Sequence, residues 1–281
     1  MTLTVAVPAS SANLGAGFDV LGLALAMPMV VSLDPNNGRP ATGGHPARTA
    51  FAAAGGRGDV YCDDRIPSGR GLGFSGAARA GAVTLAFAQA ESVGACDLQT
   101  FIERNRDRIH RVAAELEGHG DNVGASVYGG LIVATADEAR KFPVVADVRV
   151  VVWVPDHTTS TDKSRAMLPV TIGQADAVVN IASASRLVGA LTTGDIDALR
   201  GATLDRMHQD LRLASSPTGA QVLTALVEHG AECAWLSGSG PTVAAFVRPE
   251  RCSSLVERMH GLHGSTGRIL DLDIDRAGLR A

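Results

Sequence analysis

Residues 69–82 read GRGLGFSGAARAGA, a stretch dominated by glycine and alanine. Gly69, Gly71 and Gly73 allow the backbone to approach a ligand closely, because they lack a side chain. The alanine-rich run that follows contains no proline and predicts a buried helix over 75–90. A loop that opens a helix presents free backbone N–H groups at the positive end of the helix dipole. The stretch therefore predicts an anion site, and phosphate groups suit that place.

The same letters match G-x-G-x-x-G, the dinucleotide-binding fingerprint, over residues 71–76. That reading requires a strand before the loop, a helix after it, and an acidic residue at the end of a second strand about 20 residues later. Glu91 lies at the right distance but directly follows the helix, and the segment SVGACDL after it is not a strand pattern. A nicotinamide or flavin cofactor is therefore disfavoured. For the loop taken alone, a glycine-rich turn without a ligand remains the alternative.

The bulk composition is that of a globular protein. The chain has 281 residues, of which 46% are hydrophobic and 19% charged, so it can bury a sizeable core as one large domain or two packed lobes. The net charge of −4, the absence of a Lys/Arg-rich block and the two Trp and two Tyr residues argue against a nucleic-acid partner. No uncharged apolar run reaches the length needed to span a bilayer, so we expect no membrane partner.

Cysteine usage and the N-terminus bear on the compartment. The four cysteines contain no C-x-x-C pair, which argues against a structural zinc site and a dense disulfide framework. The N-terminus MTLTVAVPASSANLG lacks the basic start and long apolar run of a signal peptide. We predict a cytoplasmic protein with reduced thiols.

The hydrophobic patterns predict a mixed α+β fold. The clearest helix covers 98–116, where apolar residues recur every three or four positions until Gly118. Further helices are expected at 48–54, 75–90, 176–191, 196–211, 217–229 and 252–261, and strands at 3–7, 60–66, 131–134, 148–154, 233–236, 243–247 and 268–274. Residues 20–31 form a long apolar run with no breaker before Pro28. Residues 33–46 are rich in Pro, Gly and Asn and are predicted to form a loop. We expect two lobes, 1–143 and 144–281.

Three segments resemble, in order, the motifs of the GHMP small-molecule kinases. Residues 67–77, PSGRGLGFSGA, resemble the phosphate-binding motif P-x-x-x-G-L-G-S-S-A, and residues 236–242, LSGSGPT, resemble the third motif. Residues 7–19, VPASSANLGAGFD, resemble the first motif in the form typical of homoserine kinases. The resemblance implies an α+β fold with a ribosomal-S5-domain-2-like N-terminal lobe and a ferredoxin-like C-terminal lobe. The active site is expected in the cleft between them.

Three more segments are similar to the homoserine kinase branch of that superfamily. They are ELEGHGDNV at 115–123, STDKSRAMLP at 160–169 and DRMHQDLR at 205–212. The resemblance implies an ATP- and Mg²⁺-dependent phosphotransferase that converts the small molecule L-homoserine to O-phospho-L-homoserine in threonine biosynthesis. A homodimer is the usual state of that family.

The resemblance also implies roles for individual residues. Arg165 and Arg212 would bind the carboxylate of the amino acid, because a guanidinium matches two oxygens in a fork. Asp19, with Asn13 beside it, would accept from the ammonium group. The nucleotide phosphates would lie along the loop formed by Pro67, Ser68, Gly69, Arg70, Gly71, Leu72, Gly73, Phe74, Ser75, Gly76 and Ala77.

Catalysis is expected to depend on positioning and charge stabilisation. Ser75 and Glu117 match the positions that hold Mg²⁺, which prefers few protein ligands and keeps several waters. His119 and Asn122 match positions near the substrate hydroxyl. Other GHMP kinases carry an aspartate base where this chain has Asn122, so we expect that no strong base acts and that the hydroxyl loses its proton late.

Several positions depart from the family pattern. Phe74 stands in the place of the first serine of the phosphate motif, and the segment between the first two motifs is reduced to the 33–46 stretch, which leaves adenine recognition open. Two alternatives follow. One is a kinase of the same fold that acts on another hydroxyl amino acid such as threonine, and the other is a non-catalytic member that binds a small molecule.

Overall fold

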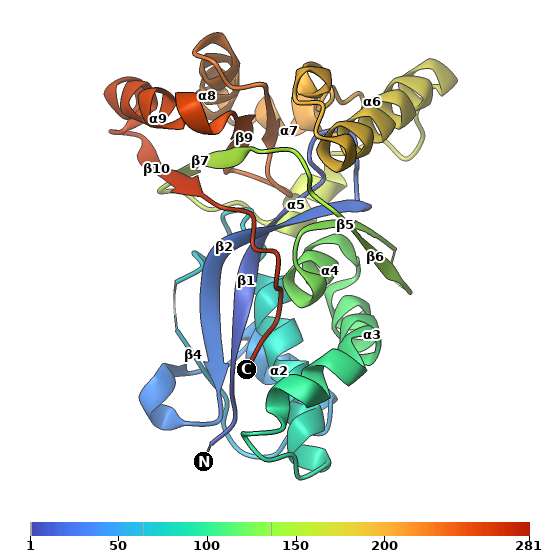
Figure 1. Cartoon of the computed structure of the whole chain (residues 1–281), viewed down its shortest axis with the longest axis vertical. Coiled ribbons are helices and arrows are strands. Elements are labelled where there is room, and N and C mark those ends of the chain that lie inside the picture. Colours follow the sequence, from blue (N-terminus) through green and yellow to red (C-terminus); the bar gives the residue numbers. More distant parts are fainter. Residues whose placement is uncertain (1, 64, 136) are drawn as a thin grey trace.

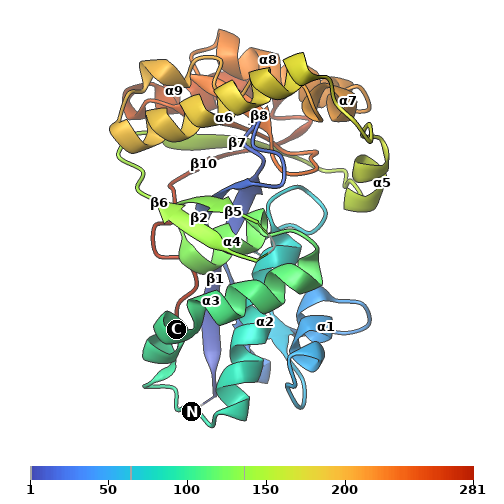
Figure 2. The same ribbon diagram turned by 90° about the vertical axis from the view of Figure 1, so that its right-hand side faces the viewer.

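The structure is a computed structural model that describes residues 2–281 except 64 and 136, and the backbone but not the side chain of residue 162. Two antiparallel sheets stand one above the other, each covered by helices (Figures 1 and 2). The first sheet contains β1 (Thr4–Ala12), β2 (Leu21–Ser32), β3 (Arg39–Pro40), β4 (Tyr61–Cys62), β5 (Leu131–Ala134) and β6 (Ala139–Phe142). The long strand β2 pairs with β1 along one edge and with β4 and β5 at opposite ends of the other edge.

One face of this first sheet is covered by helices (Figure 2). They are α1 (Pro46–Ala53), α2 (Phe74–Ala90), α3 (Leu98–Glu117) and α4 (Asp121–Tyr128). Most of α2 is buried, its buried residues are mainly alanine and glycine, and it packs against β1, α1 and α3. Small side chains allow this close approach, so the alanine-rich sequence places the helix, and the loop before it, at the centre of the lobe.

The second sheet has the strand order β10-β7-β9-β8, with all neighbours antiparallel. Its strands are β7 (Arg149–Pro155), β8 (Cys233–Leu236), β9 (Val243–Val247) and β10 (Gly267–Leu272). The helices α6 (Gln174–Thr193), α8 (Pro217–Glu228) and α9 (Pro249–His263) lie above it in Figure 1. Several helices, the last of which is α8, connect the first strand to the second, and α9 connects the third to the fourth. Together with the strand order, this is the ferredoxin-like arrangement that the resemblance implies.

The C-terminal segment leaves the second sheet and returns to the first. Isolated bridges join Leu25 to Ile274 and Ala6 to Arg280, so the C-terminus lies in the N-terminal lobe, beside β1, while the N-terminus lies at the far end of that lobe (Figure 1). The division at residues 143/144 stays a prediction. Among the described residues, no helix is both long and apolar enough to cross a bilayer.

Most predicted elements are confirmed within a few residues, but the helix predicted over 196–211 is wrong. In its place the chain forms the 3₁₀ turn η2 (Asp197–Leu199), irregular turns, and the short helix α7 (Gln209–Leu213). Gly201 has a φ of 70°, which ends the helical path, and the Asp205 carboxylate binds the backbone N–H groups of His208 and Gln209. The helices α4 and α5 (Thr161–Ala166) were not predicted.

Candidate active site

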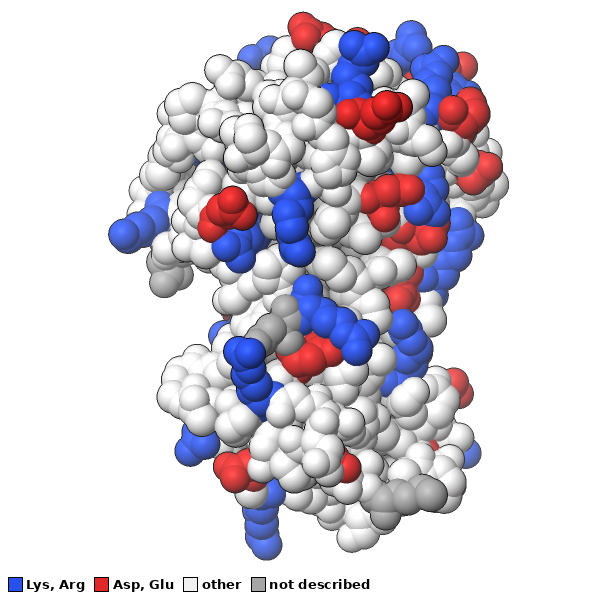
Figure 3. Space-filling model, turned by 90° about the vertical axis from the view of Figure 1, so that its left-hand side faces the viewer, with Lys and Arg blue, Asp and Glu red and all other residues white. Residues whose placement is uncertain are grey.

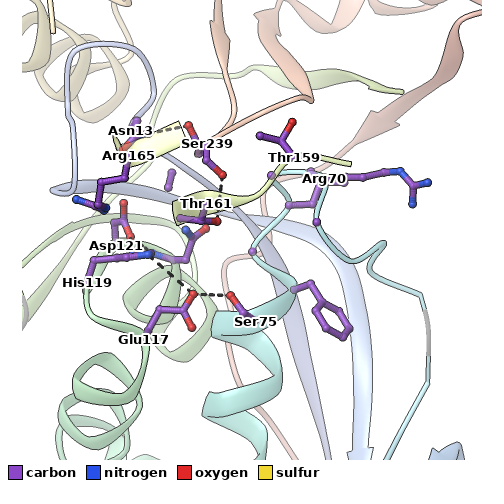
Figure 4. A pocket seen from close by; sticks show the side chains of 18 of the residues that line it. Asn13, Arg70, Ser75, Glu117, His119, Asp121, Thr159, Thr161, Arg165 and Ser239 are labelled. Atoms are coloured by element: carbon purple, nitrogen blue, oxygen red, sulfur yellow. Dashed lines mark hydrogen bonds and ion pairs between the residues drawn. The ribbon is translucent and has the colours of Figure 1, made fainter. Parts of the chain in front are cut away.

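A cavity of about 250 Å³ lies between the two lobes (Figure 4). Its walls come from the end of β1, from the loops that the sequence motifs form, and from residues of α2, α3, α4, α5 and α7. It is lined by Ala12, Asn13, Asp19, Pro46, residues 68–75, Glu117, His119, Asp121, Asn122, Thr159, Thr161, Arg165, Arg212, Gly238 and Ser239. The cavity therefore gathers segments that lie more than 200 residues apart in the chain.

Hydrogen bonds join the three glycine-containing motifs around this cavity. The Ser237 hydroxyl donates to the carbonyl oxygen of Gly71 at 2.6 Å and lies 2.7 Å from the hydroxyl of Ser11. The Asn13 side chain donates to the carbonyl oxygen of Gly238 at 2.9 Å. These buried polar groups satisfy one another, so the glycine loop is held between the two lobes.

The glycine loop runs directly into α2. The N-cap is Gly73, in the left-handed conformation, and no side chain caps the helix. A Cβ atom at Gly73 would lie 1.9 Å from the Ser10 hydroxyl, and one at Gly71 would lie 2.3 Å from the carbonyl oxygen of Ser237. Glycine is therefore required at both positions. The first residues of α2, Phe74 and Ser75, line the cavity, and no side chain caps their N–H groups.

A carboxylate and a hydroxyl meet beside this helix terminus. The Ser75 hydroxyl donates to one oxygen of Glu117, and Arg79 binds the other oxygen (Figure 4 shows the first of these contacts). The Glu117 side chain is 8% exposed. Arg79 neutralises this buried carboxylate, because an unpaired charge would be costly there.

His119 lies in the short link between α3 and α4, and Asn122 lies in the first turn of α4. His119 Nδ1 lies 2.7 Å from a carboxylate oxygen of Asp121, which is almost fully buried. Burial would lower the pKa of His119, but this hydrogen bond and the negative charges of Asp121, Glu117 and Asp19 outweigh it and raise the pKa above its ordinary value. Asn122 accepts a hydrogen bond from the Ser10 hydroxyl at 2.9 Å through its side-chain oxygen.

Two predicted substrate-binding residues bind each other in this structure. The Arg165 guanidinium donates to both carboxylate oxygens of Asp19, at 2.7 and 2.9 Å. Asp19 has a φ of 56° and Asn13 a φ of 70°, and the Asp19 backbone N–H donates to the Asn13 side-chain oxygen at 3.1 Å. The turn between them thus directs the Asp19 carboxylate toward α5.

Arg212 lies deeper in the same end of the cavity. It is 5% exposed and donates to the carbonyl oxygen of Gly238 at 3.1 Å. Its Nε has no hydrogen-bond partner within the described part of the chain. Burial, together with the positive charge of Arg165, lowers the pKa of Arg212 from its usual value. A buried guanidinium with an unused donor is a site for an anion.

A second, more open cavity of about 620 Å³ adjoins the first beyond the glycine loop. Both cavities contact Pro46, Ser68, Arg70 and Phe74, and the second also contacts His45 and Ile66. The Phe74 ring meets the His45 ring edge-on, with centroids 5.4 Å apart. Aromatic and apolar surfaces of this kind suit a flat ring system. On the face shown in Figure 3, Lys and Arg side chains lie along the waist between the lobes.

The structure brings most of the predicted site residues together, with three exceptions in the glycine loop. Gly76 and Ala77 are buried in α2 and do not line the main cavity, and Pro67 lines the adjoining cavity but not the main one. The Arg70 side chain points away from the cavity (Figure 4) and donates to the carbonyl oxygens of Pro155 and Asp156.

Sequence reasoning missed several residues that line or support the cavity. Ser10 and Asp121 lie inside segments that were singled out, yet only a folded chain shows that Ser10 contacts Asn122 and Asp121 contacts His119. Thr159, Thr161 and Ser239 also line the wall. Thr161 and Ser239 lie inside segments that resemble family motifs, whereas Thr159 lies just before one.

A metal ion would need ligands in addition to these side chains. Within the described part of the chain, no cluster of three or more His, Cys, Asp or Glu residues suits a metal ion. Ser75 and Glu117 supply one hydroxyl and one carboxylate next to the helix terminus, and this donor set fits Mg²⁺ when phosphate oxygens and waters complete the shell.

The two lobes, the glycine loop at the start of α2 and the cleft between them define a small-molecule kinase of the GHMP class. The model of the GHMP kinases N terminal domain matches residues 45–130. A crystal structure of homoserine kinase from Cytophaga hutchinsonii has the same fold, with a TM-score of 0.80 at 23% identity, and the match covers 99% of this chain and 96% of that one.

Sequence similarity narrows the class. A homoserine kinase of Thermus thermophilus is 34% identical, over 95% of this chain and 94% of its own length. A homoserine kinase of Deinococcus radiodurans is 36% identical, over 98% of this chain and 95% of its own length. The chain belongs to the homoserine kinase family.

Proposed function

We propose that this protein transfers the γ-phosphoryl group of ATP to the side-chain hydroxyl of L-homoserine and forms O-phospho-L-homoserine for threonine biosynthesis. One observation carries the proposal. The same cavity contains an uncapped helix N-terminus in a glycine loop and, at its other end, one carboxylate and two guanidiniums. The first feature suits a polyphosphate and the second suits a zwitterionic amino acid.

The charges of the cavity complement an α-amino acid. The substrate carboxylate would take the place of Asp19 on Arg165 and would accept from the guanidinium of Arg212, while the ammonium group would donate to Asp19. An uncharged alcohol would leave the Arg165–Asp19 pair in place and Arg212 without its acceptor. This complementarity favours an amino acid over a sugar or an isoprenoid alcohol.

The nucleotide would extend from the glycine loop into the adjoining cavity. Its phosphates would accept from the N–H groups at the start of α2, and its base would lie against Phe74 and Pro46. Phe74 removes a serine hydroxyl from the phosphate motif but provides an apolar surface where the 33–46 segment is short. A magnesium ion held by Ser75 and Glu117 would neutralise phosphate charge when bound.

The reacting hydroxyl would lie beside Asn122 and His119. Asn122 has a carboxamide, which orients a hydroxyl but cannot take its proton. The residues of the chain therefore position the acceptor for in-line attack, and the proton leaves late, toward the transferring phosphate. His119 carries positive charge more readily than an ordinary histidine, which favours an electrostatic role close to the phosphate.

An ADP-release assay with L-homoserine, L-threonine and no acceptor, run with ATP and then GTP, tests the proposal. We expect homoserine-dependent turnover with ATP. Preference for threonine would instead identify a related kinase. Calorimetry that detects amino-acid binding but no ATP binding in the presence of Mg²⁺ would identify a non-catalytic member. A cytoplasmic homodimer is the expected state of the protein, and light scattering would measure its mass.

A further inference from the structure

His208 lies outside the cavity lining but touches both halves of the amino-acid end. It is 1% exposed. Its Nε2 lies 2.8 Å from the carbonyl oxygen of Gly15, and its Nδ1 lies 3.1 Å from an Nη1 nitrogen of Arg212. A carbonyl oxygen only accepts and a guanidinium only donates, so Nε2 carries the proton and Nδ1 accepts from Arg212.

Further hydrogen bonds hold His208 itself in place. One oxygen of Asp205 accepts from the backbone N–H groups of His208 and Gln209, at 2.8 and 2.7 Å. The other oxygen accepts from the Asn180 side chain at 2.7 Å. Asn180 also donates to the carbonyl oxygen of Ala16 at 3.3 Å. The start of α7 and the 13–19 loop are therefore both attached to α6.

An aromatic contact completes the connection. The Phe18 ring lies 5.2 Å from the His208 ring, centroid to centroid. The guanidinium carbons of Arg212 and Arg165 lie 5.4 and 5.5 Å from the Phe18 centroid. Phe18 belongs to the loop that carries Asn13 and Asp19, so this loop and the two guanidiniums pack around one ring.

We propose that His208 is a positioning residue, which sets the separation between the carboxylate-binding Arg212 and the ammonium-binding 13–19 loop. The inference rests on the proposed function, because it assumes that the cavity binds an α-amino acid. One ring nitrogen of His208 holds Arg212, which would bind the substrate carboxylate. The other holds Gly15 in the 13–19 loop, which would bind the ammonium group. His208 touches neither the substrate nor the nucleotide, so its loss weakens recognition of the carboxylate without affecting ATP.

Two substitutions separate the two contacts of His208. His208→Asn keeps an acceptor near Nδ1 but shortens the side chain away from Gly15, whereas His208→Gln keeps a donor that reaches Gly15 and loses the acceptor for Arg212. We expect the dissociation constant of L-homoserine, measured by calorimetry, to rise about tenfold in His208→Gln and less in His208→Asn. The KM for ATP should stay within about twofold of the wild type in both.

Two controls distinguish positioning from a loss of stability. Thr203→Val removes a buried hydrogen bond to the carbonyl oxygen of Ala234 in the same region, and we expect it to lower the melting temperature but not homoserine affinity. The amino diol in which the homoserine carboxylate is reduced to an alcohol should be phosphorylated equally well by the wild type and His208→Gln, because Arg212 then has no carboxylate to bind.

The outcomes are distinct. Suppose that the wild type phosphorylates homoserine. If His208→Gln binds homoserine as tightly as the wild type does, or if it loses as much activity with the amino diol as with homoserine, the positioning role is wrong and the proposed function stands. If the wild type neither binds nor phosphorylates homoserine, the proposed function fails, and the inference with it.

Discussion

At the amino-acid end of the cavity, some charged side chains form ion pairs with one another in the absence of a ligand. Asp19 accepts both donors of Arg165, while Arg212 Nε has no partner within the described chain. A zwitterion brings one charge of each sign, so it can exchange partners with the Arg165–Asp19 pair and also supply an acceptor for Arg212. Binding therefore depends on both ends of the amino acid at once.

Arg212→Lys tests whether binding depends on the carboxylate of the amino acid, because Arg212 is the most buried of the charged residues at this end of the cavity. Lysine keeps the charge but loses the planar fork, so the bidentate contact with the carboxylate is lost. We expect the kcat/KM for homoserine to fall by about tenfold to a hundredfold, the range expected when a charge-assisted hydrogen bond is removed. Steady-state kinetics should show an unchanged KM for ATP, and a variant that loses ATP affinity alone would argue against the assignment.

Asn122→Asp tests the absence of a strong base. The Asn122 side chain accepts from Ser10 and has no group that can take a proton. A carboxylate there would add negative charge near the transferring phosphate, so we expect kcat to decrease, or to increase by less than about tenfold. A hundredfold increase in kcat with a new ionisation in its pH profile would show that proton abstraction limits the reaction.

The candidate site residues could be predicted because the motifs lie in short contiguous segments. Ser75, Glu117, His119, Asn122, Arg165 and Arg212 all line the cavity. Their partners could not be predicted in the same way. The contact between His208 and Gly15, for example, joins residues whose separation in the sequence is 193, and no periodicity encodes such a contact.

At the scale of secondary-structure elements, the junction between the glycine loop and α2 is the most constrained feature. Gly73→Ala would place a Cβ atom 1.9 Å from the Ser10 hydroxyl at a residue with a φ of 69°. We expect a loss of about 1–2 kcal/mol in unfolding free energy from the backbone conformation alone, and weaker ATP binding. Denaturant unfolding and ATP titration measure the two effects.

Gly189→Ala is the matched control for this substitution. Gly189 lies inside α6, and a Cβ atom there would meet nothing within 4 Å. We expect this variant to be up to about 1 kcal/mol more stable, because alanine favours a helix interior. If Gly73→Ala and Gly189→Ala changed the unfolding free energy and the ATP affinity equally, the special role of the loop geometry would be contradicted.

Elements with strong local patterns could be predicted, and those set by distant contacts could not. The buried alanine run of α2 and the apolar period of α3 mark those helices in the sequence. The region 196–211 also has helical composition, but the Asp205 carboxylate takes the backbone N–H groups of residues 208 and 209 and starts a shorter helix there. The Asp205 carboxylate is itself held by the Asn180 side chain of α6, so a side-chain hydrogen bond anchored by a distant contact outweighs local propensity in that segment.

For the molecule as a whole, the buried His208 makes stability depend on pH. Burial lowers its pKa below the usual 6.5, and Arg212 acts in the same direction against the opposing charges of Asp205 and Asp19. The unfolded chain therefore binds a proton at His208 near pH 6.5 that the folded chain does not, so the contribution of His208 to the unfolding free energy should decrease as the pH falls through about 6.5. His119, whose pKa is raised, contributes in the opposite direction. His208→Asn should remove the His208 contribution from the pH dependence measured by denaturant unfolding, and an unchanged slope would contradict this assignment.

Phosphorus NMR of a reaction that contains the purified protein, ATP, Mg²⁺ and L-homoserine tests the central claim most directly. The account predicts a phosphomonoester resonance that couples to the methylene protons next to the homoserine side-chain oxygen, and that appears together with ADP. If only inorganic phosphate appears, at the same rate with and without homoserine, the cavity does not carry out this transfer.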